Sequence, residues 1–423
     1  MARSGIVLGK WGWRTLRYNG DVHTLMVAPS GSGKTTTLGI PTALTWKHSL
    51  FVHDPKGELH PASKDWRSTF SRVISLNPTS PDSDCYDPLK AIRWNKDQET
   101  RDVALLTDIL VDPEGEPPGS ATAQHFRDLC NAFLHGVVVH GFYTSQATTL
   151  RELDEFFFSE ASLEAVLKEM EHTGHTEDGP HYAVVRSVRM LKRLDDRQLS
   201  GVLSTASRAL QMTMDPLVAR MTSSSSFTLQ DLRERQRPMS LYLTVPYADQ
   251  ERLRPLSRLI VRQVLDYSTQ HLGGWRHRLC MLIDECQALH RMPALPSALN
   301  FVRGYGLNLV LITPSLNEFD RLYGHANNFV EGCHLRVIFA PNDPSIAERF
   351  SRMTGTEDVP DMRRQGVTTE ERLLSATGVT YLPQDQGLLL IGNGGYPALI
   401  RKAPYYRNWR LKRRSQVGRR RAA

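Results

Sequence analysis

The sequence predicts an α/β fold in which a mostly parallel sheet is interrupted by an all-α insertion. Three observations support this prediction. Short apolar runs, of the length of buried strands, alternate with amphipathic helical patterns in the first and last parts of the chain. A glycine-rich turn joins the first clear apolar run to the start of a helix. Between about residues 95 and 235 the periodicity is helical, and no convincing strand is found there.

The composition is typical of a soluble globular protein. The chain has 423 residues, of which 40% are hydrophobic and 23% charged, and this length suits two or three compact units. No apolar run approaches the roughly 18 residues that a membrane-spanning helix needs. The residues after Met1 also lack the apolar segment of a signal peptide.

The cysteines predict reduced thiols in the cytosol. They are odd in number and contain no Cys-x-x-Cys pair, so neither a disulfide framework nor a zinc site is indicated. We expect the nearest pair, Cys280 and Cys286, to be buried structural residues and not metal ligands. The five are Cys85, Cys130, Cys280, Cys286 and Cys333.

The net charge of +7 is concentrated at the end of the chain. Residues 407–423 contain eight basic and no acidic residues, which leaves 44 basic against 45 acidic residues in the remainder. Such a segment is typical of chains that bind nucleic acid, an acidic partner or anionic lipid. It is also typical of a solvated, disordered chain end, and both interpretations stay open. The basic residues are Arg407, Arg410, Lys412, Arg413, Arg414, Arg419, Arg420 and Arg421.

The glycine-rich turn predicts a phosphate-binding loop. Gly31 and Gly33 let consecutive backbone N–H groups face one anion, and Lys34 adds a positive charge for the outer phosphates. The usual pattern begins with Gly where this chain has Ala28, a position that joins the strand to the loop and does not hold phosphate. ATP and Mg²⁺ are the expected cofactors, with Thr35 as a metal ligand. The predicted nucleotide-binding residues are Ser30, Gly31, Ser32, Gly33, Lys34, Thr35 and Thr36.

Two further strands are predicted before the helical segment, at residues 49–53 and 70–76. The first ends at Asp54. Because the carboxyl ends of parallel strands face the ligand crevice, Asp54, Lys56 and Glu58 are candidates for the rim of the nucleotide site. The alternative is a solvated cluster of loop charges.

The middle of the chain is expected to form an all-α domain at residues 95–235. Helical periodicity is clear at residues 102–110, 125–134 and 163–170. Its histidines are scattered along the sequence, and we interpret them as structural residues. The nucleotide-binding domain would then be discontinuous, comprising residues 1–94 and 236–406, and residues 407–423 would form a basic tail.

The α/β pattern resumes after this insertion, and one of its strands delivers two carboxylates. The apolar run at 279–283 ends in Asp284 and Glu285. After a glycine-rich Lys-Thr loop, this is the second signature of a nucleoside triphosphatase: Asp284 would hold the Mg²⁺ shell, and Glu285 would orient and deprotonate water. With the phosphate loop, the strands predict a RecA-like P-loop ATPase core. The other strands expected here are 240–245, 309–313, 335–339 and 387–391.

Several sequence strings resemble the coupling proteins of type IV secretion, the TraG/TraD-like ATPases of bacterial conjugation. The similarity spans nearly the whole chain, including the position of the helical insertion. The string Asp-Pro-Lys-Gly-Glu-Leu is unusually specific to this family. The strings are Ala28 to Lys34, Asp54 to Leu59, Tyr86 to Leu89, Leu282 to Glu285, Leu289 to Met292, Phe301 to Gly306, and Tyr323-Gly324.

The resemblance implies a homo-hexameric ring with a RecA-like motor and an all-α domain that faces the relaxosome or the secretion substrate. It implies DNA as a partner, single-stranded or bound to a relaxase, and a cytoplasmic location at the bacterial inner membrane. Family members usually carry an N-terminal membrane anchor, which this sequence does not contain. We therefore expect attachment through an anchor missing from this chain, or through a partner.

Two positions bear on catalysis within the resemblance. The family tends to place Gln at the tip of the strand after Asp284-Glu285, where this chain has Pro314, so Ser315 or Asn317 would have to sense the γ-phosphate.

Arg303 lies 18 residues beyond Glu285, in the loop that enters the strand at 309–313. In a parallel sheet this loop lies at the edge opposite the phosphates. The resemblance assigns an interfacial arginine to this position, so we expect Arg303 to act on a neighbouring subunit's nucleotide, the alternative being a surface arginine that complements a helix dipole.

The sequence favours an ATP-driven translocase that delivers DNA or nucleoprotein to a secretion channel, with Lys34, Glu285 and Arg303 as catalytic residues. A nucleotide-regulated adaptor that recruits protein substrates without moving DNA is the alternative. A P-loop kinase is disfavoured by the long separation of Lys34 from Glu285 and by the absence of an Arg-rich lid near the phosphate loop.

Overall fold

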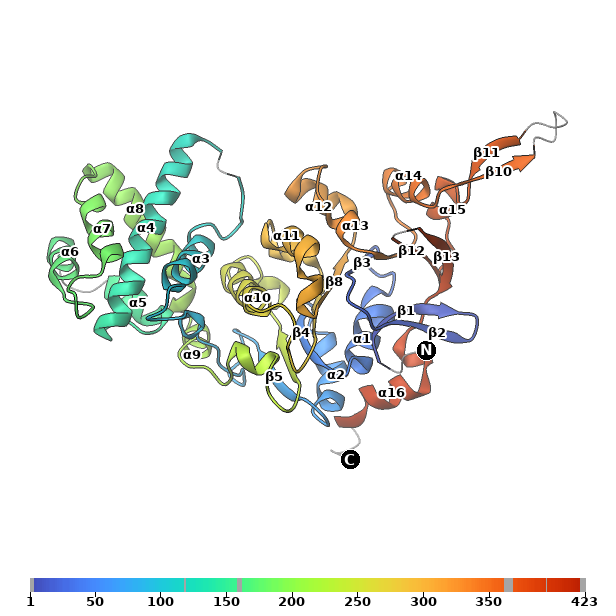
Figure 1. Cartoon of the computed structure of the whole chain (residues 1–423), viewed down its shortest axis with the longest axis horizontal. Helices are drawn as coiled ribbons and strands as arrows, with labels where there is room; N and C mark the ends of the chain where they lie inside the picture. Colours follow the sequence, from blue (N-terminus) through green and yellow to red (C-terminus); the bar gives the residue numbers. More distant parts are fainter. Residues whose placement is uncertain (1–3, 118, 158–161, 361–367, 393, 419–423) are drawn as a thin grey trace. The chain divides into compact units, whose positions relative to one another are not determined.

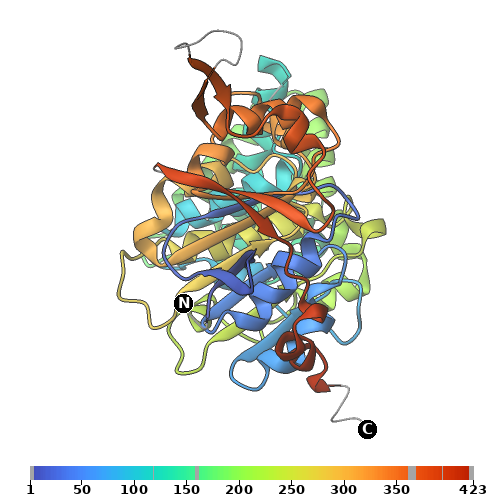
Figure 2. The ribbon, with the colours of Figure 1, turned by 90° about the vertical axis from the view of Figure 1, so that its right-hand side faces the viewer.

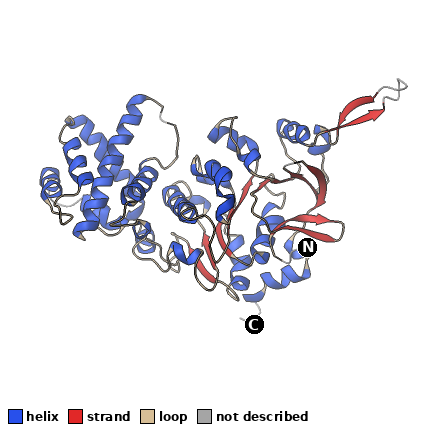
Figure 3. Cartoon of the chain, in the orientation of Figure 1, coloured by secondary structure: helices blue, strands red, loops and turns tan. Residues whose placement is uncertain are grey.

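The computed structural model describes the chain except for residues 1–3, 118, 158–161, 361–367, 393 and 419–423 (Figure 1). It divides into two compact units. The sheet unit comprises Met1–Ile74, Gln230–Thr244 and Ser268–Ala423, and the helical unit comprises Ser75–Leu229 and Val245–Tyr267. The predicted α/β class with an all-α insertion is confirmed. In Figure 3 the strands belong mainly to the sheet unit, which also contains helices, whereas the helical unit is drawn mainly as helices and loops.

The sheet unit contains an 11-stranded sheet in the order β2-β1-β13-β12-β9-β3-β8-β7-β4-β6-β5. From β9 to β6 the neighbouring strands are parallel, whereas β12, β13, β1 and β2 extend the sheet with antiparallel pairs. In this order the strands are Arg14–Tyr18, Ile6–Trp11, Gly395–Arg401, Gln386–Ile391, Leu335–Ile338, Thr24–Val27, Leu307–Thr313, Leu279–Ile283, Ser49–His53, Met239–Leu243 and Arg72–Leu76.

The eight strands predicted from the sequence are all present. Of the antiparallel extension only β12 was predicted, and β13, β1 and β2 were missed. Central strands are buried on both faces and therefore read as continuous apolar runs. The edge strand β2 and the inner strand β13 are only partly buried and lack such a run. A separate hairpin, β10 (Thr356–Pro360) and β11 (Thr368–Arg372), also lacks one.

Helices cover both faces of the sheet (Figures 1 and 2). Met26, Val52 and Val310 pack into one buried cluster with residues of α1 (Ile40–Thr45) and α2 (Leu59–Arg67). The alternate strand residues are equally buried on the other face, because successive side chains of a strand point to opposite sides. The other helices of this unit are α11 (Ala294–Phe301), α12 (Leu316–Tyr323), α13 (Phe329–Gly332), α14 (Pro344–Met353), α15 (Ala376–Thr380) and α16 (Trp409–Ser415).

Arg67, at the end of α2, is fully buried and holds this face of the sheet unit together. Its guanidinium donates to the carbonyls of Ala43 at 3.0 Å, Trp46 at 2.7 Å and His48 at 2.7 Å. Its Nε donates to the Ser240 hydroxyl on β6. Burial lowers the pKa of Arg67 to about 10, which leaves the side chain charged at neutral pH.

We expect Arg67→Met to lower the free energy of unfolding by about 3 kcal/mol or more, because it leaves three buried carbonyls without their donor. Arg237→Met is the matched control, since Arg237 is exposed and donates only to the Ser68 carbonyl at 3.3 Å in the described structure. Denaturant unfolding of both variants measures the difference. Equal effects of the two substitutions would contradict the role assigned to Arg67.

The helical unit begins earlier than expected from the sequence and includes a later helix. Tyr86 donates to the side chain of Gln263 at 2.8 Å, and Gln263 donates to the Pro88 carbonyl at 2.9 Å. These contacts join the segment after β5 to α10 (Arg254–Ser268). The expected boundaries at residues 95 and 235 therefore differ from those of the compact unit. Its other α-helices are α3 (Glu99–Val111), α4 (Ala121–Thr144), α5 (Leu150–Phe157), α6 (Leu163–His172), α7 (Tyr182–Leu191), α8 (Asp196–Leu210) and α9 (Pro216–Met221).

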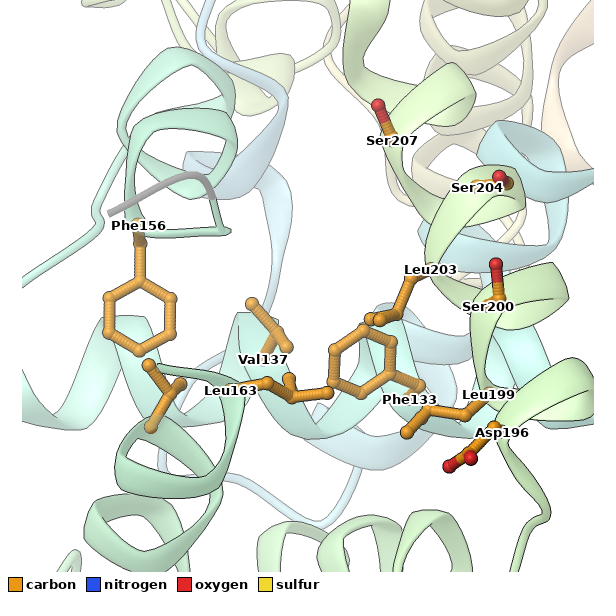
Figure 4. A pocket seen from close by; sticks show the side chains of 11 residues that line it. Phe133, Val137, Phe156, Leu163, Asp196, Leu199, Ser200, Leu203, Ser204 and Ser207 are labelled. Atoms are coloured by element: carbon orange, nitrogen blue, oxygen red, sulfur yellow. The ribbon is translucent and has the colours of Figure 1, made fainter. Parts of the chain in front are cut away.

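The helical unit contains a cavity of about 500 Å³ (Figure 4). Apolar side chains of α4 and α8, such as Phe133 and Leu203, line one part of it, and three serines of α8 line another. Elsewhere in this unit the scattered histidines come together, with the rings of His140 and His175 2.9 Å apart at their nearest nitrogens. Among the described residues, no group of three or more His, Cys, Asp or Glu side chains is arranged to hold a metal ion.

The basic end of the chain is in part a docked helix. Leu411 of α16 is 3% exposed, and Arg414 donates to the Leu44 carbonyl at 2.8 Å. The Arg414 guanidinium also lies 4.4 Å from the centre of the Trp66 ring. A wholly solvated tail is therefore the wrong interpretation for 409–415, while the arginines at 419–421 lie outside the described residues. No helix in the described part of the chain is long and apolar enough to span a membrane.

Candidate nucleotide-binding site

The predicted phosphate loop follows β3 at the centre of the sheet. Ala28 is buried, and its N–H bonds the Thr313 carbonyl of β8 at 3.0 Å, so this residue continues the strand. This explains why Ala is accepted where the usual pattern has Gly. Gly31 and Gly33 have φ of 78° and 86°, in the left-handed region that side chains with a Cβ rarely adopt. The loop is thus curled as an anion cradle requires.

The helix after the loop begins with a wide turn. Thr35–Gly39 is π-helical (η1), and the Ile40 N–H bonds the Thr35 carbonyl, five residues back. Pro41, at the start of α1, has no N–H to donate to the carbonyl four residues earlier, which disfavours regular α-helix here. Such single π turns are frequent at functional sites.

Glu285 lies between two lysines. Its Oε1 is 2.6 Å from the ammonium of Lys34 and 2.6 Å from that of Lys56, and Gln287 donates to its other oxygen. Burial raises the pKa of Glu285, but the bonds from Lys34, Lys56 and Gln287 together outweigh burial and hold the pKa below its ordinary value. Glu285 is therefore an ionised acceptor with one oxygen shared by two cations.

Glu285 also sits on a strained backbone. Its φ is 50°, directly after β7, in a region that costs a non-glycine residue about 1 kcal/mol or more. Strain of this kind persists where the surrounding structure fixes it, and it is concentrated at functional sites. Here it accompanies the turn that brings the carboxylate beside Lys34.

Thr35 and Asp284 meet beside this ion pair. The Thr35 hydroxyl donates to Asp284 Oδ2 at 3.3 Å, and Asp284 is fully buried. Burial and the nearby Glu285 raise the pKa of Asp284 to about 7. A hydroxyl and a carboxylate are hard oxygen ligands of the kind that Mg²⁺ prefers. These two residues, with the phosphates of a nucleotide, fit the site predicted for the ion.

The ligand-free protein should lose stability as the pH rises through the titration of Asp284. The folded carboxyl titrates near 7 and its ordinary value is 3.8, so between these values the folded chain keeps a proton that the unfolded chain has lost. We expect Asp284→Asn to remove this decline. Thermal unfolding without nucleotide or Mg²⁺, at about pH 5 and about pH 7, measures this decline. The same pH dependence of stability in the parent protein and in Asp284→Asn would contradict the assignment of this decline to Asp284.

Of the three rim candidates, only Lys56 reaches Glu285. Asp54 is buried and accepts the N–H groups of Glu58 at 3.0 Å and of Leu59 and His60 at 2.9 Å each. Asp54 therefore caps the start of α2. Its charge also contributes to the raised pKa of the nearby Asp284, so its place at the rim of the nucleotide site stays a prediction. The side chain of Glu58 is exposed to solvent.

Lys402 was missed by sequence reasoning. It follows β13, and its ammonium donates to the Ser32 carbonyl of the phosphate loop at 3.0 Å and lies 4.0 Å from the centre of the Phe339 ring. Burial lowers the pKa of Lys402. No local pattern could have identified it, because it follows a strand that was not predicted and lies 370 residues from the loop in the sequence.

Arg303 lies at the opposite edge of the sheet, as expected from the sequence. It belongs to the turn η7 (Val302–Tyr305) that enters β8, and its Nη2 is 2.6 Å from Nδ1 of His334, which precedes β9. Arg303 also lowers the pKa of His23, which precedes β3, although burial has the larger effect. The structure thus separates Arg303 from the phosphate loop of its own chain.

The candidates for γ-phosphate sensing take part in local structure. Ser315 caps α12 by accepting the Asn317 N–H at 3.2 Å, and the Asn317 side chain donates to Asp343 at 2.6 Å. Their predicted sensing role would require one of these side chains to exchange its partner for phosphate.

Comparisons with known proteins agree with this geometry. A family model described as "Type IV secretory system Conjugative DNA transfer" matches residues 3–421. The conjugal transfer protein TraG of Escherichia coli is 32% identical over 397 residues, covering 88% of this chain and 61% of TraG. Protein VirD4 of Agrobacterium fabrum is 27% identical over 431 residues, covering 96% of this chain and 62% of VirD4. The chain therefore spans about three fifths of the length of these two relatives.

The fold also resembles a solved structure. Plasmid coupling protein TrwB, in complex with ADP and Mg²⁺, superposes with a TM-score of 0.72 at 17% sequence identity, covering 96% of this chain and 89% of TrwB. The identity is low, so this similarity bears on the fold. It extends over both the sheet unit and the helical unit.

Proposed function

The chain belongs to the type IV secretory system conjugative DNA transfer family, and from this membership we propose that it is an ATP-hydrolysing coupling protein. It would deliver DNA, single-stranded or bound to a relaxase, to a type IV secretion or conjugation channel. The observation that carries the proposal is that Lys34 and Thr35, after β3, contact Glu285 and Asp284, after β7. These two central strands flank β8 in the sheet. TrwB, whose solved structure contains ADP and Mg²⁺, supports the choice of nucleotide and ion.

Each residue of the site would have a separate role in hydrolysis. The loop N–H groups and Lys34 would bind the phosphates, and Thr35 and Asp284 would hold Mg²⁺, which supplies charge neutralisation on the phosphate oxygens. Glu285 would orient the attacking water and accept its proton at a carboxylate oxygen. A move of the Lys34 ammonium from Glu285 to a phosphate would free one side of Glu285. Lys56 would continue to position that carboxylate.

We propose a homo-hexameric ring as the working assembly, with relaxosome and channel components as partners. In such a ring a neighbour's Arg303 would reach the nucleotide, since its own chain's loop lies at the other edge of the sheet. The site of action would be the cytoplasmic side of the bacterial inner membrane.

The alternative is a nucleotide-regulated adaptor that recruits protein substrates without pumping DNA. One observation favours it: the cavity of about 500 Å³ in the helical unit, where apolar residues and serines line a space suited to side chains of a partner (Figure 4). An adaptor needs binding and release of nucleotide, but it does not need hydrolysis stimulated by DNA.

An ATPase assay with and without single-stranded DNA, repeated across protein concentrations, separates the two functions. We expect activity to rise with DNA and to rise more than proportionally with protein concentration, because the site would be completed at a subunit interface. Lys34→Ala is the negative control. Nucleotide binding without DNA-stimulated turnover at any concentration would reject the translocase and favour the adaptor.

A further inference from the structure

A second pocket in the sheet unit carries a concentration of positive charge. It has a volume of about 570 Å³ and lies between β2, with the turn before it, and α16. Half of the residues that line it are arginines, and none is acidic. The arginines are Arg14 and Arg17 on the β2 side, and Arg410 and Arg414 on α16.

The charges of this pocket are not neutralised by the protein. In the part of the chain that the structure describes, none of the four arginines forms an ion pair with a carboxylate. The buried Nε of Arg17 has no hydrogen-bond partner among the described residues. Burial, followed by the neighbouring Arg17 and Arg410, lowers the pKa of Arg414. Like charges gathered without counter-charges favour binding of an anion with several acceptor oxygens, such as a phosphate ester.

One exposed tryptophan, Trp13, lines the pocket, and two more, Trp11 and Trp409, lie close to lining residues in the sequence. Trp11 and Trp13, 70% and 84% exposed, stand at the tip of the β1–β2 hairpin, and Trp409, 68% exposed, begins α16 (Figures 1 and 2). Exposed tryptophan is costly in water, whereas its apolar body and polar N–H suit the headgroup region of a membrane. Aromatic residues beside basic ones are also the pattern of proteins that bind membrane surfaces.

Two of the tryptophan rings pair with arginines of the pocket. The guanidinium of Arg14 lies 4.8 Å from the Trp13 ring centre, and that of Arg410 lies 5.2 Å from the Trp409 ring centre. One face of each ring is therefore already covered by a cation from the same chain. Insertion among headgroups would bring each ring and its paired cation to the same interface.

We propose that these residues form a binding face for the phosphate of anionic phospholipid headgroups on a membrane surface. The arginine–tryptophan face, as we name it, consists of Trp11, Trp13, Arg14, Arg17, Trp409 and Arg410. The arginine pocket receives the headgroup phosphate, and the tryptophans enter the interface around it. The proposal does not depend on the ATPase assignment, since none of its residues contacts the nucleotide site.

Flotation of the whole chain with vesicles tests the proposal. Phosphatidylcholine vesicles are compared with vesicles that also contain phosphatidylglycerol. Arg17→Gln with Arg410→Gln removes two pocket charges. The matched control, Lys412→Gln with Arg413→Gln, removes two exposed charges of the same helix that do not line the pocket. We expect binding that requires phosphatidylglycerol, a loss of about tenfold or more for the pocket variant, and a clearly smaller loss for the control.

A second pair of measurements keeps the test valid if the pocket variant folds poorly. Trp13→Ser and Arg14→Gln alter exposed residues at the hairpin, so folding, checked by thermal unfolding, should be unaffected. Each should weaken vesicle binding. In the parent protein, lipids with brominated acyl chains should quench tryptophan fluorescence, and Trp13→Ser should reduce that quenching.

Several outcomes would overturn the proposal. Equal losses in the pocket variant and its control would mean diffuse charge attraction, and equal binding to neutral vesicles would remove the role of the phosphate. Full displacement of vesicles by inorganic phosphate or glycerol phosphate would indicate a site for a soluble phosphate. Tight binding of a single-stranded DNA oligonucleotide that the pocket variant loses, without any vesicle binding, would indicate a nucleic-acid surface.

Discussion

Arg303→Ala is expected to reduce ATP turnover by on the order of 10³-fold or more while leaving ATP affinity nearly unchanged. The side chain lies at the edge of the sheet where β8 and β9 begin, whereas the phosphate loop lies where β3 ends. Its effect on hydrolysis must therefore come from another copy of the chain. A guanidinium that reaches a neighbour's γ-phosphate would stabilise charge in the transition state and contribute little to binding.

A structural role of Arg303 must be separated from this catalytic one. Its contact with the His334 ring at 2.6 Å provides the control, because His334→Ala removes that contact and keeps the guanidinium. We expect His334→Ala to retain most of the activity. If both substitutions abolish turnover equally, Arg303 acts through the local structure.

Mixed assemblies test the action in trans directly. Arg303→Ala subunits mixed with Glu285→Gln subunits should recover part of the activity, because some interfaces then pair an intact Arg303 with an intact Glu285. Ring formation is confirmed beforehand by light scattering. Absence of recovery at every mixing ratio would count against an interfacial arginine.

Glu285→Gln should lower the hydrolysis rate by about 10²-fold to 10⁴-fold and preserve ATP binding. Gln keeps the size of the side chain and its bond to Gln287 but cannot accept a proton from water at neutral pH. It also removes the carboxylate that holds Lys34 and Lys56 at 2.6 Å in the ligand-free protein. Lys34 is then more available to phosphate, so we expect ATP affinity to be equal or higher.

Two control variants accompany Glu285→Gln. Glu58→Gln changes an exposed carboxylate just after Lys56 and should leave turnover unaltered. Lys34→Ala should instead weaken nucleotide binding itself, because the loop loses its charge for the outer phosphates. Binding is measured with a fluorescent ATP analogue, and turnover by phosphate release. Hydrolysis by Glu285→Gln at the parent rate would show that another group is the base.

The parts of the fold that were predictable are those with a local signal. The central strands are buried on both faces and appear as apolar runs, and Gly31 and Gly33 mark a turn that other residues rarely form. Asp284 and Glu285 were identifiable because they directly follow such a run. The position of Arg303 at the far edge followed from the alternation of strands and helices alone, since parallel strands all end at the same side.

The sequence by itself determined which segments are buried, which turn takes the curled backbone of an anion cradle, and which two carboxylates stand at a strand tip. Only the tertiary structure decided which distant side chains complete the site. Lys56 and Glu285 are 229 residues apart, and Lys402 and Ser32 are 370 residues apart. It also decided that Asp54 caps a helix and that α16 packs into the sheet unit. The physical reason is that periodicity records whether a residue faces the core or the solvent, whereas the partner it meets there depends on how the whole chain packs.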